Sequence, residues 1–581
     1  MAVENLITEH IDIWTSAVKT RSTSGRGSSK KLELYGIKKL RELILELAVR
    51  GKLVPQDSSD EPASVLLERI AQEKAQLVKE KKLKKPKKLP NIIDEEKPFD
   101  LPNGWSWIRL NEYGEWGSGS TPKRSNSGYY DGGIPWFKSG ELKADYISES
   151  EETITELALS ETSVRYNNVG DVLVAMYGAT IGKTAILSVR ATTNQAVCAC
   201  TPFTGLSNTY LLTLLKAYKA RLIGMGAGGA QPNISREKII NTVIALPSTA
   251  EQHRIVAKVD ELMALCDQLE QQTEASIEAH QVLVTTLLDT LTNSADADEL
   301  MQNWARISEH FDTLFTTEES IDQLKQTILQ LAVMGKLVPQ DPSDEPAAEL
   351  LKRIAEEKAQ LVKDKKIKKQ KALPPINEDE KPFELPSGWE WERIGTFGVV
   401  GTGATPSRSN PKYWDDPKYN WVSSGETSEL FVSTTKEKVS ELAIQETNVS
   451  IYPSGTLIVA MYGQGKTRGQ ITELTEPAGT NQACAAIQLI EKNESHKDFV
   501  KLYFRKSYEE LRSNAAGGAQ PNLNVGKVQS TVIAVPPLNE QQRINTKVNE
   551  LLTVCDHLKA HFEAVQSTQL HLTDAIVEQA V

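Results

Sequence analysis

The chain contains two copies of one sequence module. Residues 44–107 align with residues 328–391 without a gap, and roughly 46 of these 64 positions are identical. A second match follows in each half: AGGAQPN at 227–233 returns at 516–522, and the helical sequence that begins at Glu251 returns at Glu540. The fold must therefore contain the same arrangement twice, and a doubled module is suited to a partner that is itself two-fold, such as duplex DNA.

Each copy closes with a long helical stretch that carries an apolar seam. The pattern from Ser248 to Glu251 is a capping box, which predicts where the first of these helices begins. Seam residues then recur at alternating spacings of three and four. They are Ile255, Val259, Leu262, Cys266, Leu269, Leu283 and Leu287 in the first copy, and Ile544, Val548, Leu551, Cys555, Leu558, Phe562 and Leu572 in the second.

Two seams of this length predict an intramolecular antiparallel coiled coil, which relates the halves by a pseudo-two-fold axis. Each helix would span roughly 55 Å, which exceeds one turn of B-DNA at about 34 Å. The coiled coil could therefore act as a ruler between two globular blocks. The alternative is a coiled coil that only holds a homodimer together.

Composition places the chain among ordinary globular proteins. It has 581 residues, 39% of them hydrophobic and 25% charged, with a net charge of −11 and five cysteines. This charge argues against a protein that coats nucleic acid by charge alone, although specific binding needs only local cations. With no leader, no membrane span and no zinc-type cysteine spacing, we expect a reduced, cytoplasmic protein that binds no metal and has no membrane contact.

The pattern predicts a mixed α/β fold with two globular blocks. The blocks are rich in Gly, Ser and Thr and contain short strand-like runs such as 171–178 and 456–463. An apolar stripe at Ile37, Leu40, Ile44 and Leu47 predicts a helix before the first block. Eight segments are expected. They are an N-terminal helix with its tether (1–30), the first repeated helical segment (31–104), the first globular block (105–248), the first closing helix (249–292), a connector (293–317), the second repeated helical segment (318–388), the second globular block (389–537) and the second closing helix (538–581).

Two kinds of segment lie between these elements. Lysine-dense tails at about 79–88 and 363–371 are either solvated linkers or strips that face phosphate. Short amphipathic segments at 9–14 and 309–315 begin each half, and the first is followed by a flexible tether at Thr20–Lys31. Segments of this kind often dock onto a partner.

No catalytic signature is present. GATIGKT at 178–184 is one residue short of a phosphate-binding loop, and its counterpart at 463–467 is shorter still. We interpret it as a turn that presents Lys183, with Lys466 in the second copy. Nucleophile, metalloprotease and adenine-methyltransferase motifs are absent, so we expect a chain that catalyses nothing by itself.

The alternation of repeated helical segments with variable blocks resembles the specificity subunits of type I restriction–modification systems. The resemblance rests on GKLVPQD at the end of each first helix, the DEPA segment after it and the EQ-x-R-I opening of each closing helix. It implies two target recognition domains that read a bipartite double-stranded DNA site, with the gap set by the coiled coil. It also implies two modification subunits, which use S-adenosylmethionine and methylate a flipped adenine, and two restriction subunits, which use ATP and Mg²⁺. This chain would hold no cofactor.

Within the blocks the copies agree only in short islands, at 117–126 with 401–410, 136–141 with 421–426, and 193–196 with 480–483. The divergence between islands predicts half-sites of different sequence. Candidate DNA-binding residues have donors or acceptors for base edges and phosphates. They are Ser118, Ser120, Thr121, Lys123, Arg124, Tyr177, Thr180, Lys183 and Gln231, and in the second block Thr402, Thr405, Ser407, Arg408, Tyr462, Lys466, Arg468 and Gln520.

Positions shared by both copies cannot explain different targets, so island residues are better suited to phosphate contacts or turns. We expect base readers in the divergent stretches 124–131, 139–151 and 423–435. Two other functions stay open at this point. A stand-alone DNA-bridging protein would bind its site without partners, and a coiled-coil scaffold would have no sequence-specific DNA affinity.

Overall fold

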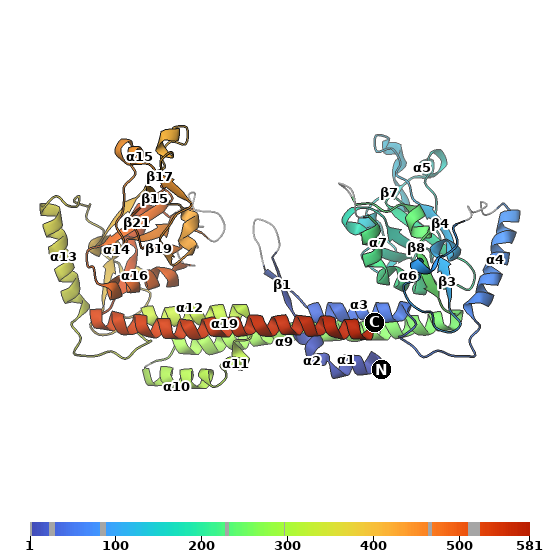
Figure 1. The fold of residues 1–581 in the computed structure, drawn as a ribbon, viewed down its shortest axis with the longest axis horizontal. Helices are drawn as coiled ribbons and strands as arrows, with labels where there is room; N and C mark the ends of the chain where they lie inside the picture. Colours follow the sequence, from blue (N-terminus) through green and yellow to red (C-terminus); the bar gives the residue numbers. More distant parts are fainter. Residues whose placement is uncertain are drawn as a thin grey trace. The chain divides into compact units, whose positions relative to one another are not determined.

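The computed structural model describes residues 3–22, 30–81, 89–226, 232–295, 297–462, 467–508 and 523–581. Contacts divide the chain into two units, Met1–Ser276 with Val565–Val581, and Ile277–Ala564. Each unit has a layer of helices with a sheet domain on one side of it (Figure 1). The long helices α9 (Thr249–Thr292) and α19 (Leu538–Ala580) contribute to both units. The boundary between the units therefore falls within each long helix, whereas the sequence predicted each long helix as one undivided segment.

In unit 1 the helical layer consists of α3 (Tyr35–Val49), the first part of α9 and the last turns of α19. Arg41 pairs with Glu270 at 2.6 Å, and Gln56, beyond the end of α3, bonds Glu251 at 2.6 Å, so α9 runs antiparallel to α3. At the start of α3 the Tyr35 hydroxyl donates to Asp574 at 2.7 Å. Just after the end of α3, Lys52 donates to the main-chain oxygen of Val581 at 2.6 Å. The end of α19 is thus parallel to α3 and antiparallel to α9.

Unit 2 repeats this layer with α12 (Glu318–Val333), the first part of α19 and the end of α9. Lys325 pairs with Asp556 at 2.7 Å and Lys559 with Glu318 at 3.4 Å, so α12 is antiparallel to α19. Gln281 donates to Glu319 at 2.9 Å, and Lys336 reaches the carbonyl of Thr292 at 2.8 Å, so α12 is parallel to the end of α9. The expected antiparallel pairing of the two long helices is confirmed within each unit.

The apolar seam changes register midway along each helix. Ile255, Val259, Leu262, Cys266 and Leu269 are buried in the first half of α9, but Leu283 is 49% exposed and Val284, Leu288 and Leu291 are buried instead. In α19 the residue Leu572 is 45% exposed and its neighbour Thr573 is buried. The predicted seam is therefore wrong at Leu283 and Leu572.

The shift has a geometric cause. A strict seven-residue repeat drifts around a helix of 3.6 residues per turn, and an extra four-residue step brings the seam back. Such a step occurs where the seam of α9 passes from the buried Leu269 to the half-buried Thr273 and Ile277. It coincides with the boundary between the units at Ser276, where the partner of α9 changes from α3 to α12.

The register shift predicts different costs for two identical substitutions. Leu288→Ala should lower the free energy of unfolding by about 2–5 kcal/mol, because it leaves a cavity at a buried position. Leu283→Ala, one turn earlier and half-exposed, should change it by about 0.5 kcal/mol or less. Urea unfolding of the two variants measures this difference. A larger loss of unfolding free energy for Leu283→Ala would support the unshifted seam instead.

The short helices before each layer pack on their own chain. In unit 1, α1 (Val3–Glu9) and α2 (Ile11–Ser16) bury Ile7 and Trp14 in the same core as α3. In unit 2, α10 (Ala297–Ser308) and α11 (Phe311–Leu314) bury Ile307 and Leu314. The interpretation of these segments as partner-docking elements is wrong for these buried faces, because their apolar residues already have intramolecular contacts.

The stretch expected to be a flexible tether contains two paired strands. Strand β1 (Lys19–Ser22) pairs antiparallel with β2 (Lys30–Glu33), and residues 23–29 between them lie outside the described residues. Helices α4 (Ala63–Lys79) and α13 (Ala347–Lys363) follow the layer in each unit. The first lysine-dense tail lies outside the described residues from 82 to 88, whereas the second is described as exposed or half-buried chain.

Each sheet domain has a five-stranded sheet, a smaller three-stranded sheet and a two-stranded ribbon. The strand orders in unit 1 are β4-β11-β8-β9-β6, β10-β5-β7 and β12-β3. Their bounds are β3 (Ser106–Arg109), β4 (Gly114–Ser118), β5 (Tyr130–Phe137), β6 (Tyr146–Ile147), β7 (Thr153–Ile154), β8 (Val172–Ala175), β9 (Thr184–Leu187), β10 (Thr192–Thr193), β11 (Val197–Pro202) and β12 (Val243–Leu246). The helices are α5 (Glu156–Glu161), α6 (Asn208–Ala217), α7 (Lys219–Gly226) and α8 (Arg236–Ile240).

Unit 2 has the same sheets, with orders β14-β21-β18-β19-β16, β17-β15-β20 and β13-β22. Its strands are β13 (Glu390–Arg393), β14 (Gly398–Thr402), β15 (Tyr419–Val422), β16 (Phe431–Val432), β17 (Glu437–Val439), β18 (Leu457–Ala460), β19 (Ile471–Leu474), β20 (Ala478–Thr480), β21 (Cys484–Leu489) and β22 (Val532–Val535). Its helices are α14 (Ile394–Phe397), α15 (Glu441–Glu446), α16 (Glu494–Lys506) and α18 (Val525–Ser530). The mixed α/β fold expected from the sequence is confirmed.

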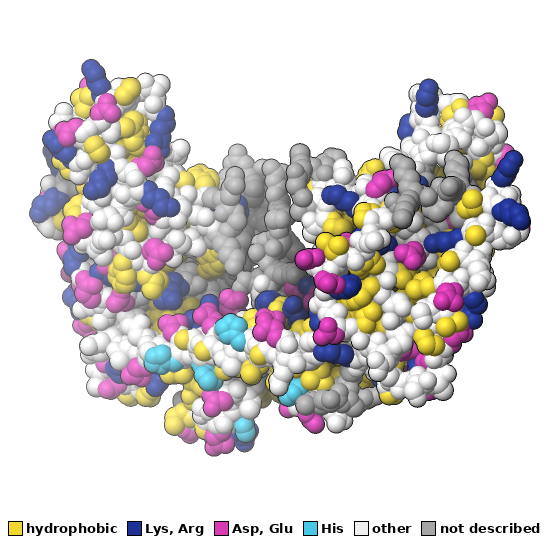
Figure 2. Space-filling model, turned by 45° about the vertical axis from the view of Figure 1, so that its right-hand side comes forward, with side chains coloured by type: hydrophobic (Ala, Val, Ile, Leu, Met, Phe, Trp, Pro, Cys, Tyr) yellow, Lys and Arg dark blue, Asp and Glu magenta, His cyan; other side chains and the backbone are white. Residues whose placement is uncertain are grey.

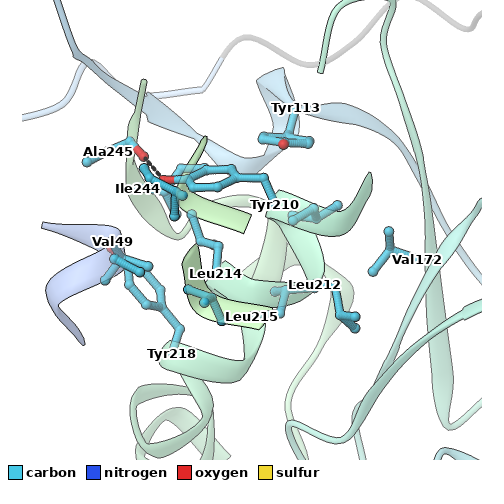
Figure 3. Packing of buried hydrophobic residues seen from close by; sticks show 14 of the residues in the cluster. Val49, Tyr113, Val172, Tyr210, Leu212, Leu214, Leu215, Tyr218, Ile244 and Ala245 are labelled. Atoms are coloured by element: carbon cyan, nitrogen blue, oxygen red, sulfur yellow. Dashed lines mark hydrogen bonds between the residues drawn. The ribbon is translucent and has the colours of Figure 1, made fainter. Parts of the chain in front are cut away.

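Helix α6 joins the five-stranded sheet to the helical layer. Tyr210, Leu214 and Leu215 are fully buried, and their side chains fill the space between α3, β12 and β8 (Figure 3). The buried hydroxyl of Tyr210 is oriented by the carbonyl of Ala245, 3.5 Å away. One continuous core therefore runs from the helices into the sheet domain.

A buried carboxylate fixes this junction at the start of each long helix. Glu251 is 3% exposed and accepts hydrogen bonds from the Trp105 indole at 2.8 Å and from Gln56 at 2.6 Å. Two residues of the same repeated segments, Asp60 and Arg254, form an ion pair at 2.6 Å beside it. Burial raises the pKa of Glu251 above its usual value.

Unit 2 contains the same network. Glu540 accepts from Trp389 at 3.0 Å and from Gln340 at 3.2 Å, and Arg543 pairs with Asp344 at 2.8 Å. The repeated segments GKLVPQD, SDEP and GW supply the glutamine, the aspartate and the tryptophan, and EQ-x-R-I supplies the glutamate and the arginine. The sequence repeats are therefore explained by a hydrogen-bonded junction between helices and sheet domain, because a buried polar group that loses its partner costs about 1–3 kcal/mol.

The glutamine after each carboxylate is satisfied differently in the two units. The side-chain oxygen of Gln252 accepts from the backbone N–H of Ser207 at 3.0 Å and from the Tyr113 hydroxyl at 3.3 Å. In unit 2 the side-chain oxygen of Gln541 faces His496 Nδ1 at 3.1 Å. Gln541 also donates to the carbonyl of Pro536 at 2.7 Å, which orients its amide and makes His496 Nδ1 the donor.

His496 predicts that unit 2 responds more steeply to acid than unit 1. Burial lowers the pKa of the imidazole, so the unfolded chain binds a proton more readily than the folded one. The contribution of His496 to stability is complete above about pH 6.5 and falls as pH decreases below it, by at most about 1.4 kcal/mol per pH unit. Hydrogen exchange at pH 7 and pH 5 should show a larger loss of protection in α16 than in α6, and an equal loss in both helices would contradict this assignment.

Candidate nucleic-acid interface

The sequence islands come together at one edge of the five-stranded sheet. In unit 1 the backbone N–H of Gly119 donates to the carbonyl of Val197 at 2.9 Å, and that of Ser120 donates to Thr193 at 3.0 Å. The N–H of Met176 donates to Ala196 at 2.8 Å. Three segments that are far apart in sequence therefore form one continuous surface after the ends of β4 and β8.

A fourth segment joins them. The N–H of Ile234 donates to the carbonyl of Met176 at 2.9 Å, and that of Gly178 donates to Pro232 at 2.8 Å. We call residues 118–124, 176–183, 193–196 and 232–234 the island rim of unit 1. In unit 2, Thr402 donates to the carbonyl of Cys484 at 3.0 Å and Met461 N–H to Ala483 at 2.7 Å, which places the corresponding islands together again.

Two glutamines that the sequence reasoning did not single out hold the rim turns in place. The Thr121 hydroxyl donates to Gln195, and the Thr405 hydroxyl donates to Gln482. Both glutamines belong to the repeated TNQA island, and this repetition is the signal that could have identified them. They show that part of each island shapes a turn.

Two of the three candidate arginines, Arg124 and Arg408, brace the small sheet. Arg124 pairs with Glu152 at 2.5 Å and stacks over the Tyr130 and Trp136 rings at 4.6 and 5.1 Å. Arg408 makes two bonds to Glu437, at 2.5 and 2.7 Å, and stacks over Trp414 at 3.9 Å. The carboxylate partner raises the pKa of each guanidinium. Because these guanidinium groups already have partners, they are weaker candidates for base contacts than the sequence suggested.

The remaining candidates have different environments. Lys123 is exposed, Lys183 is half-buried, and Tyr177 is 43% exposed. The Thr180 hydroxyl donates to the Tyr177 carbonyl at 2.7 Å, and that of Ser120 shares a hydrogen bond with Ser163 at 2.8 Å.

In unit 2 the Ser407 hydroxyl bonds that of Ser409 at 2.7 Å, and Tyr462 packs against the core. Ser118 and Arg468 are half-buried. Gln231, Lys466 and Gln520 lie outside the described residues.

In the turn formed by GATIGKT, backbone amides already donate hydrogen bonds to carbonyl groups of the chain. The N–H of Gly182 donates to Ala175 at 3.0 Å, and that of Lys183 donates to Thr180 at 2.9 Å. A phosphate cradle needs consecutive amides that converge on the anion. This turn is instead a closed connection between β8 and β9 that presents Lys183, as the sequence interpretation proposed.

Charge is mixed over the described surface. In Figure 2, Lys and Arg side chains alternate with Asp and Glu on the face in view. Within the residues that the structure describes, no group of His, Cys, Asp and Glu has the arrangement of a metal site. The same residues include no helix that is both long and apolar enough to span a membrane.

Two regions of the chain, 102–279 and 386–564, match the family model described as the type I restriction modification DNA specificity domain. The chain belongs to this family of specificity subunits. Each match covers one sheet domain and the start of the long helix that follows it. The family therefore repeats within the chain as the sequence does.

Two full-length relatives align over the whole chain. The chain is 43% identical to the type I restriction enzyme EcoEI specificity subunit and 42% identical to that of EcoAI, both from Escherichia coli, with all of each chain covered. A chain from a structural study of type I R-M complex assembly is 16% identical with a TM-score of 0.49, covering 83% of this chain and 99% of that one.

The backbone at Gly119 lies close to that at Thr193, so a larger side chain at this position should be destabilising. A Cβ atom on Gly119 would overlap the carbonyl oxygen of Thr193, whereas a Cβ on Gly140 would meet nothing within 4 Å. Gly119→Ala should therefore destabilise unit 1 by about 1–3 kcal/mol, and Gly140→Ala should be close to neutral. Urea unfolding distinguishes them, and equal stability of both variants would contradict the packing of the rim.

Proposed function

We propose that this specificity subunit reads a bipartite DNA site, with one half-site for each sheet domain. The observation that carries the proposal is the contrast within each domain. Hydrogen bonds of the rim recur in both units. Met176 N–H donates to Ala196 as Met461 N–H does to Ala483, and the Thr121 hydroxyl donates to Gln195 as that of Thr405 does to Gln482. The loops between islands differ in sequence. Shared rims suit phosphates, which carry no sequence information, and divergent loops suit base edges.

The candidate residues divide accordingly. Lys123 and Lys183 have the charge and accessibility for phosphate contacts in unit 1, with Lys466 as the proposed equivalent in unit 2. The hydroxyls of Thr121, Thr180, Thr402 and Thr405 serve to shape turns. Base recognition then falls to the stretches 139–151 and 423–435 and to the side chains that they expose.

The chain contributes recognition and assembly, and its partners contribute the chemistry. The two helical layers have the same arrangement of helices and share repeated sequence, which suits the binding of two copies of one modification subunit. We propose that the modification subunits carry S-adenosylmethionine and that the restriction subunits use ATP and Mg²⁺. The long helices, with 44 and 43 residues, are shared by both units and would set the gap between half-sites.

We also propose a cytoplasmic location. The described residues include five free, buried cysteines, and burial raises the pKa of thiols such as Cys198 to about 12. Reduced buried thiols are usual in the cytoplasm, where disulfides are rare.

Mapping of methylated adenines tests this function. DNA from cells that express the chain with its modification subunit should carry methyl groups at one split sequence with two different halves and a constant gap. Cells with the modification subunit alone are the control and should lack this pattern. A chain that does not co-purify with the subunit and directs no split site would instead be a stand-alone DNA-bridging protein or a scaffold.

A further inference from the structure

One segment of each sheet domain is closed by the same carboxylate clamp. In unit 1 it connects β5 to β7. The Glu141 carboxylate accepts the backbone N–H of Lys138 at 2.6 Å with one oxygen and that of Glu151 at 2.6 Å with the other. The two ends of the intervening loop are thereby held at one side chain.

The equivalent segment of unit 2 has the same clamp. Glu426 accepts the backbone N–H of Ser423 at 2.7 Å and that of Lys436 at 2.8 Å. The sequence distance between the glutamate and the far amide is the same in both units. We call residues 142–150 and 427–435 the reading loops.

A hydroxyl provides a second tie at the same place in each loop. Ser150 Oγ accepts the backbone N–H of Trp136 at 3.1 Å and donates to the carbonyl of Glu152 at 2.6 Å. Thr435 Oγ1 accepts that of Trp421 at 3.0 Å and donates to the carbonyl of Glu437. The carboxylate clamp and the hydroxyl tie are therefore the same in the two loops.

The content of the loops differs within this frame. Leu142 and Ile147 are buried in unit 1, as are Thr427 and Val432 in unit 2, and the four residues between them are exposed in both. The exposed residues are Lys143, Ala144, Asp145 and Tyr146 in one loop, and Ser428, Glu429, Leu430 and Phe431 in the other.

The exposed positions lie beside the island rim. In unit 1, β6 pairs parallel with β9, and the N–H of Ile186 donates to the carbonyl of Asp145 at 2.7 Å. Asp145 and Tyr146 therefore lie beside β9, which begins directly after Lys183. In unit 2, β16 pairs parallel with β19, and Glu473 N–H donates to Leu430 at 3.1 Å, which gives the same placement.

We propose that Glu141 and Glu426 are positioning residues for two interchangeable reading loops, whose exposed residues 143–146 and 428–431 select the bases of the two half-sites. The inference rests on the proposed function and names the residues that distinguish the halves. Lys143 offers donors that suit guanine O6 and N7, and Glu429 offers an acceptor that suits the cytosine amino group. The clamp presents these different side chains at the same place on each domain.

An exchange of the four exposed residues tests the proposal while it keeps both clamps. In one variant residues 143–146 of the full chain are replaced by Ser-Glu-Leu-Phe, and in a second residues 428–431 are replaced by Lys-Ala-Asp-Tyr. Each is purified with its modification subunit, and its base preference is measured by selection from duplexes randomised in one half-site at a time. The first variant should change or lose preference only in the first half-site, and the second only in the second.

The glutamates are tested in parallel. Glu141→Gln keeps one acceptor but turns its amide toward the other N–H, so discrimination at the first half-site should fall by on the order of tenfold. Glu426→Gln is the matched control and should affect only the second half-site. Thermal unfolding of both variants should stay within the range of the unsubstituted complex, which separates a positioning role from a structural one.

Unchanged preference in both exchange variants, or loss at both half-sites from one exchange, would overturn the proposal. An unsubstituted complex that selects no split sequence would instead overturn the proposed function, so the two failures are distinct.

Discussion

At the first turn of each long helix a buried carboxylate accepts hydrogen bonds from a tryptophan of the sheet domain and a glutamine that follows the first helix of the layer. Glu251 and Glu540 have this role, each within 3.2 Å of both donors. Since a buried charge is costly without partners, all members of the network must be present together. This network fixes one orientation of the sheet domain on the helices. The positions of the island rim and the reading loop depend on that orientation.

This constraint accounts for the uneven fidelity of the repeat. Residues that form the junction recur almost unchanged, because each satisfies another buried polar group. Rim residues such as Gln195 and Gln482 recur because they close equivalent turns. Between them the exposed loop positions make only surface contacts, such as the Lys216–Asp145 ion pair at 2.5 Å and Lys501 over the Phe431 ring at 4.2 Å, so their side chains can differ without loss of the core. The division between frame and reader follows from which groups are buried and bonded.

The sequence predicted the doubled architecture, the mixed α/β domains and the antiparallel long helices, because repeats and apolar periodicity depend on local pattern. The sequence did not predict burial correctly where tertiary contacts determine which residues are buried. The seam at Leu283 shifts since α9 changes partner at the unit boundary, and Trp14 is buried by α3, which its local sequence does not indicate. The islands gave the right segments for the rim, but not the roles of individual residues. Arg124 carries donors suited to DNA, and only the fold reveals that Glu152 already occupies them.

The account's central claim is that the helices form a common frame and that each sheet domain alone determines its half-site. A chain in which residues 389–537 are replaced by a second copy of 105–248 tests it most directly, with methylated adenines mapped in cells that also express the modification subunit. The account predicts a symmetric split site that contains the first half-site twice, in opposite orientations, with the original gap. Retention of the original second half-site would contradict it.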